Sequence, residues 1–328
     1  MTRLYVSANY GLRIAPGAMD GSSLPSLRGR IVVLTGATSG IGLATARRVA
    51  ALGARTVLVG RGESRVRGIA DSIRAASPGA EVDAVGVDDL AVRAGWEQVA
   101  ARLRDDYPTI HVLVHAAGAM FGERQETADG IERTFALNVL APLGLTLQLA
   151  DRLIASAPAR VVLVASAAHR GARVPWDDLE ARHGYRPFAV YGRSKLELIL
   201  LTRELARRLR GTGVTVNALH PGFIRSGFGH NTPGATAATV RVLASVAGRS
   251  PERGAQTPLR LISDPSLDGV TGEYFSNGRI VPGSSASRDL ESARRLYEAC
   301  LRYLALPGLP DPDRPAHGPV AAAKAAPA

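Results

Sequence analysis

The sequence has little cysteine and no long hydrophobic run. Its 328 residues include a single cysteine, Cys300, which excludes an internal disulfide and makes a cysteine-bound zinc site unexpected. No apolar stretch is both free of charge and long enough to span a bilayer, and the leader at residues 1–28 is interrupted by Arg, Asn, Pro, Gly and Asp. We therefore expect a globular, cytoplasmic protein with neither a metal nor a membrane among its partners.

Lysine is also scarce, although the chain is strongly basic. Lys195 and Lys324 are the two lysines among 40 Lys and Arg residues, and the formal net charge is +11. Basic surfaces can bind nucleic acid, but these arginines are dispersed and alternate with Ala, Leu and Glu, as on solvated helix faces. No nucleic-acid partner is expected, whereas an acidic small molecule stays open. At position 195, we therefore expect that an arginine could not replace the lysine.

Short apolar runs rich in β-branched residues alternate with helical patterns along the chain. Strands are predicted at residues 31–35, 56–60, 82–87, 110–115, 160–165, 214–219 and 272–276. Helices are predicted to begin near Ile41, Glu63, Leu90, Gly130 and Pro187, with a last helix at 288–304. Because helices separate successive strands, the pattern predicts an α/β fold: a single Rossmann-type, doubly wound parallel sheet with helices on both faces.

The chain is expected to divide into three parts. An irregular leader at 1–28 precedes a dinucleotide-binding Rossmann domain at 29–304, which carries the active site. Within this domain, a mobile substrate loop is predicted at about 222–248, where Gly, Ser, Thr and Asn break the periodic pattern. Residues 305–328 are rich in Pro and Ala and are predicted to form a disordered tail.

A glycine-rich turn follows the first predicted strand. Gly36, Gly40 and Gly42 lie between that strand and the first predicted helix. Glycines at such a turn let the backbone approach a pyrophosphate closely and leave amide groups free at a helix N-terminus, whose dipole favours anions. The strand before the turn and the helix after it predict a dinucleotide site.

This turn, TGATSGIG at residues 35–42, resembles the TGxxxGIG turn of the short-chain dehydrogenases/reductases. The resemblance extends over about residues 29–300, and it is closest to the NADP-dependent branch that includes the retinol dehydrogenases. It implies that the cofactor is bound by Thr35, Gly36, Ser39, Gly40, Ile41 and Gly42.

The ends of the next two strands carry residues suited to the adenosine half of a cofactor. Arg61 favours NADP, because an arginine at this strand end can pair with a 2′-phosphate; Glu63 leaves NAD possible. By resemblance, Asp89 and Leu90 match the family's Asp-Leu pair, whose aspartate contacts the adenine. Asp88 is an alternative to Asp89 for that contact.

The fourth strand ends in HAAG, where the family has Asn-Asn-Ala-Gly. Ala117 and Gly118 still allow the backbone to lie close to the cofactor ribose, whereas His115 and Ala116 replace the two asparagines. A histidine that closes a buried strand is more often a hydrogen-bonded structural residue than a base or a ligand, and we expect that role for His115.

Tyr191 and Lys195 form the candidate acid–base pair. Residues four apart lie on one face of a helix, so the two side chains are expected to project together. A neighbouring ammonium stabilises a phenolate and lowers the pKa of the phenol from its usual value near 10. By resemblance, Tyr191 is the proton donor and Lys195 also holds the nicotinamide ribose. The compact ammonium suits this double role better than the planar fork of arginine.

Three further motifs complete the family pattern. Ser166, after the fifth strand, matches the serine that hydrogen-bonds the reacting carbonyl. Asn138 matches the helix asparagine that completes a water-linked proton relay to the lysine. Pro221, Gly222 and Ser226 resemble the family's PGxxxT, whose hydroxyl contacts the nicotinamide carboxamide.

Together these motifs predict an NAD(P)-dependent oxidoreductase that transfers a hydride between a nicotinamide and a carbonyl or alcohol. NADPH would favour reduction, and Phe223 and Phe228 in the predicted loop suggest a nonpolar or bulky substrate. The resemblance implies a homodimer or homotetramer. Two alternatives stay open: a cofactor-sensing or scaffold protein with little turnover, and, less favoured, a sugar-nucleotide epimerase or dehydratase.

Overall fold

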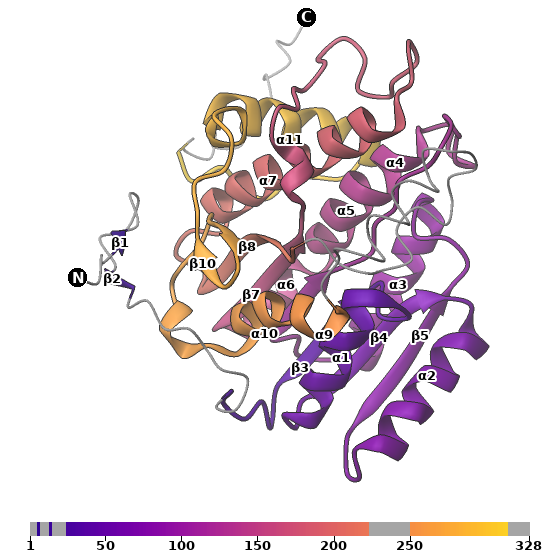
Figure 1. Ribbon diagram of the computed structural model, residues 1–328, viewed down its shortest axis with the longest axis vertical. Helices are drawn as coiled ribbons and strands as arrows, with labels where there is room; N and C mark the ends of the chain where they lie inside the picture. Colours follow the sequence, from indigo (N-terminus) through magenta and orange to yellow (C-terminus); the bar gives the residue numbers. More distant parts are fainter. Residues whose placement is uncertain (1–4, 7–12, 15–23, 223–249, 314–328) are drawn as a thin grey trace, which may run out of the picture.

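The computed structural model describes residues 5–6, 13–14, 24–222 and 250–313 of the chain (Figure 1). The predicted substrate loop therefore lies almost entirely outside the described residues, as does most of the leader. The predicted tail was expected to begin at 305, but the structure describes the chain up to residue 313.

An eight-stranded sheet forms the centre of the molecule, in the order β10-β9-β8-β7-β6-β3-β4-β5. Every neighbouring pair is parallel except β9 and β10. The strands are β3 Ile31–Thr35, β4 Arg55–Arg61, β5 Val82–Val87, β6 Val112–His115, β7 Ala159–Val164, β8 Val214–His220, β9 Tyr274–Ser276 and β10 Arg279–Ile280. The short strands β1 Tyr5–Val6 and β2 Arg13–Ile14 pair with each other. The predicted doubly wound α/β fold is confirmed.

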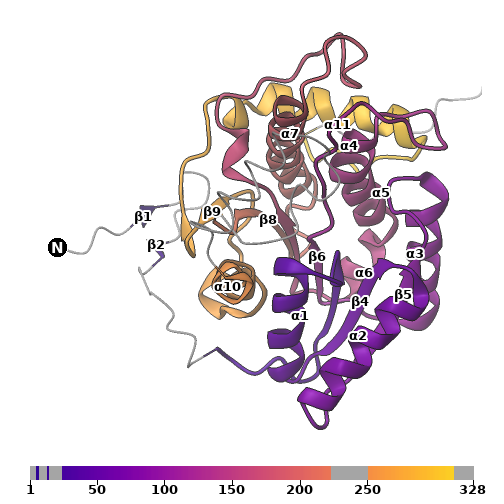
Figure 2. The same ribbon diagram turned by 45° about the vertical axis from the view of Figure 1, so that its right-hand side comes forward.

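Helices cover both faces of the sheet (Figures 1 and 2). One face holds α1 Gly40–Ala51, α2 Glu63–Ala76, α9 Pro251–Gly254 and α10 Gln256–Ser263. The other holds α3 Arg93–Asp106, α5 Ala141–Gln148 and α7 Pro187–Arg208, with α11 Leu290–Leu304 packed on α7. Short helical segments are α4 Arg133–Phe135, η1 Ala136–Leu140, α6 Ala150–Ala155, η2 Ala167–His169, η3 Pro265–Leu267 and η4 Ala286–Arg288. Within the described ranges, no helix is long and apolar enough to span a membrane.

The central strands are apolar on both sides because each side packs against helices. In β3, Val33 belongs to the core beneath α3, α5 and α7, while Val32 and Leu34 belong to the core beneath α1 and α2. All three side chains are fully buried. Two cores, one on each face, hold the strand ends in fixed positions.

Candidate active site

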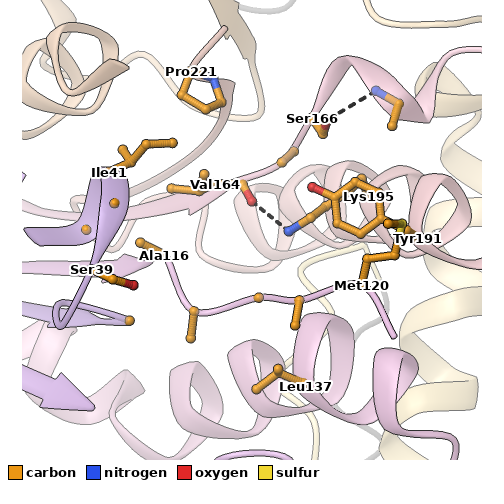
Figure 3. Close-up of a pocket in the computed structure, with 18 of the residues that line it drawn as sticks. Ser39, Ile41, Ala116, Met120, Leu137, Val164, Ser166, Tyr191, Lys195 and Pro221 are labelled. Atoms are coloured by element: carbon orange, nitrogen blue, oxygen red, sulfur yellow. Dashed lines mark hydrogen bonds between the residues drawn. The ribbon is translucent and has the colours of Figure 1, made fainter. Parts of the chain in front are cut away.

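A cavity of 880 Å³ opens at the carboxyl edge of the sheet (Figure 3). Its volume lies within the range of about 300–1,000 Å³ that is usual for small-molecule sites, and this edge is where open α/β sheets bind ligands. Most of the predicted site residues line it: Gly36, Ser39, Gly40, Ile41, Gly42, Arg61, Asp89, Leu90, Ala117, Gly118, Ser166, Tyr191, Lys195, Pro221 and Gly222. Figure 3 shows Ser39 and Ile41 toward one end, and Ser166, Tyr191 and Lys195 toward the other.

Three predicted site residues are not placed on this wall. Ser226 lies outside the described residues. Thr35 is buried behind the wall, where its hydroxyl donates to the Val114 carbonyl (3.4 Å) and accepts the Ala117 N–H (3.3 Å). Thr35 thus braces the loop that follows β6. Asn138 also lies behind the wall.

The glycine turn is packed so closely that larger residues would not fit. A Cβ on Gly36 would lie 2.6 Å from the Ala117 nitrogen, and one on Gly42 would lie 2.2 Å from the Gly36 carbonyl oxygen. Gly36 also has a φ of +68°, in the left-handed region that favours glycine. Helix α1 starts directly at this turn, so backbone amides at its N-terminus face the cavity end. These features fit a dinucleotide pyrophosphate.

Two arginines stand where β4 meets α2. Arg61, predicted from the sequence, and Arg65, which was not, both line the cavity. The carboxylate of Glu63 is occupied elsewhere, because it accepts the Gly86 N–H (2.7 Å) and pairs with Arg67 (3.0 Å). The Gly86 contact is the main reason why the pKa of Glu63 is lowered. Among the described residues at the end of β4, two arginines therefore line the cavity, and the carboxylate of Glu63 is not free to bind a cofactor.

Asp89, and not Asp88, lies on the cavity wall. One carboxylate oxygen accepts the Ala91 N–H (2.9 Å), and the other pairs with Arg133. Behind it, a Cβ on Gly95 would lie 1.9 Å from the Asp89 carbonyl oxygen, so α3 approaches the backbone of Asp89 directly. The orientation of this carboxylate is fixed by contacts that the sequence pattern did not reveal.

His115 has the structural role that was expected. Its Nε2 lies 2.8 Å from the Thr146 hydroxyl, which donates to the Pro142 carbonyl (2.7 Å). Burial lowers the pKa of His115 to about 3, so the ring is neutral. The histidine thus anchors β6 to α5 and does not line the cavity.

Asn138 holds the loop after β6 from a π-helical turn, η1. Its Oδ1 accepts the Ala119 N–H, and its Nδ2 donates to the Ala119 carbonyl and to the Ser194 hydroxyl, each at 2.9 Å. The side chain is fully buried. Its amide therefore braces the loop, and a role of Asn138 in a proton relay stays a prediction.

The hydroxyl of Ser166 lies beside the phenol of Tyr191 and favours its ionised form. Ser166 follows β7 and caps η2, with its Oγ accepting the Ala168 N–H (3.2 Å). The contact brings together two residues from different elements, and it sets both hydroxyls at one place on the cavity wall (Figure 3).

Lys195 occupies a narrow, buried slot. Its Nζ donates to the Val164 carbonyl (3.0 Å) and lies 5.5 Å from the centre of the Tyr191 ring. A Cβ on Gly118 would lie 3.1 Å from this nitrogen. Burial lowers the pKa of Lys195 to about 8. The slot admits one ammonium between a glycine and a strand carbonyl, and a planar guanidinium is broader.

The pKa of the Tyr191 phenol differs from the expectation that a neighbouring ammonium lowers it. Burial raises its pKa above the ordinary value near 10, and contact with Ser166 acts in the opposite direction with a smaller effect. The expected lowering of the pKa is therefore not found in the chain by itself, because desolvation of the phenolate is the largest effect. At neutral pH the phenol keeps its proton.

Sequence reasoning missed two residues that position the serine turn, which we define as residues 166–170. His169 is fully buried; its Nδ1 donates to the Ser166 carbonyl (2.7 Å), and its Nε2 accepts the Ser284 N–H (3.2 Å). On α7, a Cβ on Gly192 would lie 2.7 Å from the Ala168 carbonyl oxygen. The glycine beside Tyr191 thus lets the helix approach the turn.

Comparison with known proteins gives a consistent result. A family model for short chain dehydrogenases matches residues 30–235. Human retinol dehydrogenase 14 is 36% identical over 286 residues, which cover 83% of this chain and 85% of that protein. A structure from Mycobacterium paratuberculosis covers 90% of this chain and 100% of its own, with 27% identity and a TM-score of 0.73. A structure from Beutenbergia cavernae, which holds NADP at low occupancy, covers 77% and 96% respectively, with 31% identity and a TM-score of 0.60.

Proposed function

This chain belongs to the short-chain dehydrogenase family, and we propose that it uses NADPH to reduce carbonyl groups on nonpolar or bulky substrates. It is an NAD(P)-dependent oxidoreductase of alcohols and carbonyls. The proposal adds the direction, the substrate class and the preferred cofactor. The observation that carries it is the contact between the Ser166 and Tyr191 hydroxyls, on the same cavity as Lys195 and the glycine turn.

Tyr191 is the proposed acid. Because burial raises the pKa of its phenol, the hydroxyl is protonated at neutral pH and can donate to the oxygen of a carbonyl under reduction. Ser166 is proposed to hydrogen-bond the same oxygen while negative charge develops on it. When bound, the nicotinamide supplies the hydride.

Lys195 is proposed to stabilise the phenolate that remains after Tyr191 has given up its proton. With a pKa of about 8, the amine is still largely an ammonium at neutral pH. Its position near the tyrosine ring and the low polarity of the slot strengthen the attraction between the two charges. A family lysine also holds the nicotinamide ribose, and Nζ beside Gly118 is consistent with that role.

NADP is the proposed cofactor. Arg61 and Arg65 line the cavity where β4 ends, and guanidinium groups bind phosphate well. Glu63 is occupied by Gly86 and Arg67, which weakens the case for NAD. The similar structure from Beutenbergia cavernae holds NADP.

The proposed substrate class rests on apolar side chains of the cavity wall. Met120, Phe121, Leu137 and Phe188 line the cavity and present apolar surface. A similar protein is named a retinol dehydrogenase, after an alcohol with an apolar body. We also retain a cytoplasmic location and a homodimer or homotetramer as parts of the proposal, to be measured by cell fractionation and light scattering.

The proposal is tested by following NADPH and NADH consumption with a panel of apolar aldehydes and ketones. We expect Tyr191→Phe to retain nucleotide binding and lose turnover by about a hundredfold or more, because general acid catalysis contributes about 10²–10⁴-fold. Tyr107→Phe is the matched control, since the Tyr107 hydroxyl donates to Asp83, and this residue does not line the cavity.

If Tyr191→Phe reduces carbonyls at close to the unmodified rate, the assigned acid is wrong. Nucleotide binding without turnover of any carbonyl by the unmodified chain would instead favour a cofactor sensor or scaffold.

A further inference from the structure

The cavity end beside Ser166 combines a cation with an exposed aromatic ring. Arg170, at the end of the serine turn, and Phe188, in the first turn of α7, line the cavity together with Ser166 and Tyr191. Phe188 is 63% exposed, and only three large hydrophobic side chains in the described part of the chain are exposed. Arg170 is exposed as well. An amphipathic surface therefore lies next to the proposed reaction centre.

The charge of Arg170 has no carboxylate partner among the described residues. Its hydrogen bond is a long one, from Nη2 to the Pro282 carbonyl at 3.5 Å. Residues 223–249 contain no Asp or Glu and therefore add no carboxylate side chain. Asp20 is the one acidic side chain in the segments that the structure does not describe. Asp89, the carboxylate on the described cavity wall, is paired with Arg133.

The other arginines on the wall are accounted for. Arg133 binds Asp89, and Arg61 and Arg65 lie at the adenosine end, where a cofactor phosphate would meet them. Arg170 is thus the remaining arginine of the described wall, and it lies at the substrate end. Its positive charge is balanced by no carboxylate of the described residues or of residues 223–249.

We propose that Arg170 binds a carboxylate of the substrate, so that the substrate is an oxo acid with an apolar body that packs on Phe188. This inference rests on the proposed function, which places the reacting carbonyl at Ser166 and Tyr191. A guanidinium fork matches a carboxylate with two parallel hydrogen bonds. A carboxylate fits better than a phosphate, because one arginine balances one negative charge.

The test compares medium-chain ω-oxo carboxylic acids of increasing length with their methyl esters, using NADPH and the full chain. The ester keeps the length and the carbonyl but removes the charge. We expect an acid of suitable length to have a kcat/KM about tenfold higher than its ester, mostly through KM, since a charge-assisted hydrogen bond at a partly exposed site has about this effect.

Arg170→Gln should lower kcat/KM for the acid to about the value for the ester and so abolish the preference, and Arg170→Lys should restore part of the preference. Arg173→Gln is the matched control, because Arg173 is exposed three residues further along and does not line the cavity. It should keep the full preference.

The proposal is overturned if acid and ester are reduced equally by the unmodified chain, or if the preference survives in Arg170→Gln; continued turnover of the ester would leave the proposed function intact. If neither compound is reduced, thermal unfolding with NADP and a fatty carboxylate or its amide decides the matter. A stabilisation by the carboxylate alone that is lost in Arg170→Gln supports the anion site, and equal effects of acid and amide overturn it.

Discussion

Lys195 shows how one buried position can exclude arginine from an arginine-rich chain. The slot is bounded by the Val164 carbonyl, the Tyr191 ring and Gly118. An ammonium directs its hydrogens in three directions from one atom, whereas a guanidinium spreads its donors over a plane. The lysine is explained by the shape of the slot as well as by its charge.

At the scale of single residues, we predict that His169 positions Ser166 through its neutral Nδ1–H form. His169→Asn keeps a donor near the Nδ1 position, and His169→Gln keeps an acceptor near the Nε2 position that faces Ser284. If the bond to the Ser166 carbonyl matters most, Asn should retain a kcat about tenfold higher than Gln. Both variants should bind NADPH normally, as measured by fluorescence titration.

His169→Phe is the control for packing, because it keeps a ring against Tyr274, which meets His169 edge to face at 4.9 Å. Equal kcat values for the Asn, Gln and Phe variants would mean that the histidine only fills space.

The residues to which we assign the chemistry could be identified from the sequence and line one cavity, whereas the residues that support them could not be identified. Ser166, Tyr191 and Lys195 are tied to motifs whose spacing is visible along the chain. His169 acts through a bond to Ser284, which is 115 positions away, and no local pattern marks such a pair. The relay expected of Asn138 stays a prediction, whereas the bracing of the loop after β6 by its amide could not be seen in the sequence.

At the scale of elements, we predict that Gly192 sets the distance between α7 and the serine turn. In Gly192→Ala, the new methyl group would lie 2.7 Å from the Ala168 carbonyl oxygen and should force that carbonyl to move. The move costs free energy because both contacting groups belong to the backbone, which cannot rotate away as a side chain can. We expect kcat to fall about tenfold or more while the protein still folds and binds NADPH. Stopped-flow turnover and circular dichroism measure the two effects.

Gly68→Ala is the matched control, since Gly68 also lies within a helix but has open space around it. This change should stabilise the protein by up to about 1 kcal/mol and leave kcat unchanged. A normal kcat in Gly192→Ala would show that the turn adjusts freely.

Most elements could be predicted because their sequence patterns are strong. The strands at 31–35 and 82–87 begin and end as predicted, and the others differ by one or two residues at their ends. Helices α9 and α10 and strand β10 were missed. The β9–β10 hairpin had a readable signal, since Asn277 and Gly278 both adopt positive φ (49° and 71°), as Asn-Gly turns do.

At the scale of the whole molecule, the chain after α11 is held against α7 by charge. Arg207 pairs with Asp311 (2.6 Å) and Asp313 (2.5 Å), and Glu204 pairs with Arg207 and Arg208. The chain therefore stays in contact with α7 beyond residue 305, because Asp311 and Asp313 pair with Arg207. Composition alone did not reveal these partners.

We predict that this contact makes stability depend on pH. The hydrogen bond from Arg207 is the main reason why the pKa of Asp311 is lowered in the folded chain. The unfolded chain then binds the proton more readily, so the contribution to stability is complete above the ordinary pKa near 4 and is lost as the pH falls below it. Asp311→Asn should lower the Tm at pH 7 and reduce the dependence of Tm on pH in the acid range.

Asp177→Asn serves as the control, because Asp177 is exposed and, within the described ranges, forms no ion pair. Thermal unfolding from pH 3 to pH 7 measures both variants. Identical profiles for Asp311→Asn and the unmodified chain would rule out the contact as a source of stability.

The bond between His169 and Ser284 also bears on the order in which the molecule becomes active during synthesis. The glycine turn, the arginines of the adenosine end and the lysine slot are all complete by residue 222. Ser284, which fixes the histidine behind Ser166, leaves the ribosome some sixty residues later. We therefore expect a growing chain to acquire the residues of its nucleotide cradle before the residue that aligns the Ser166 hydroxyl.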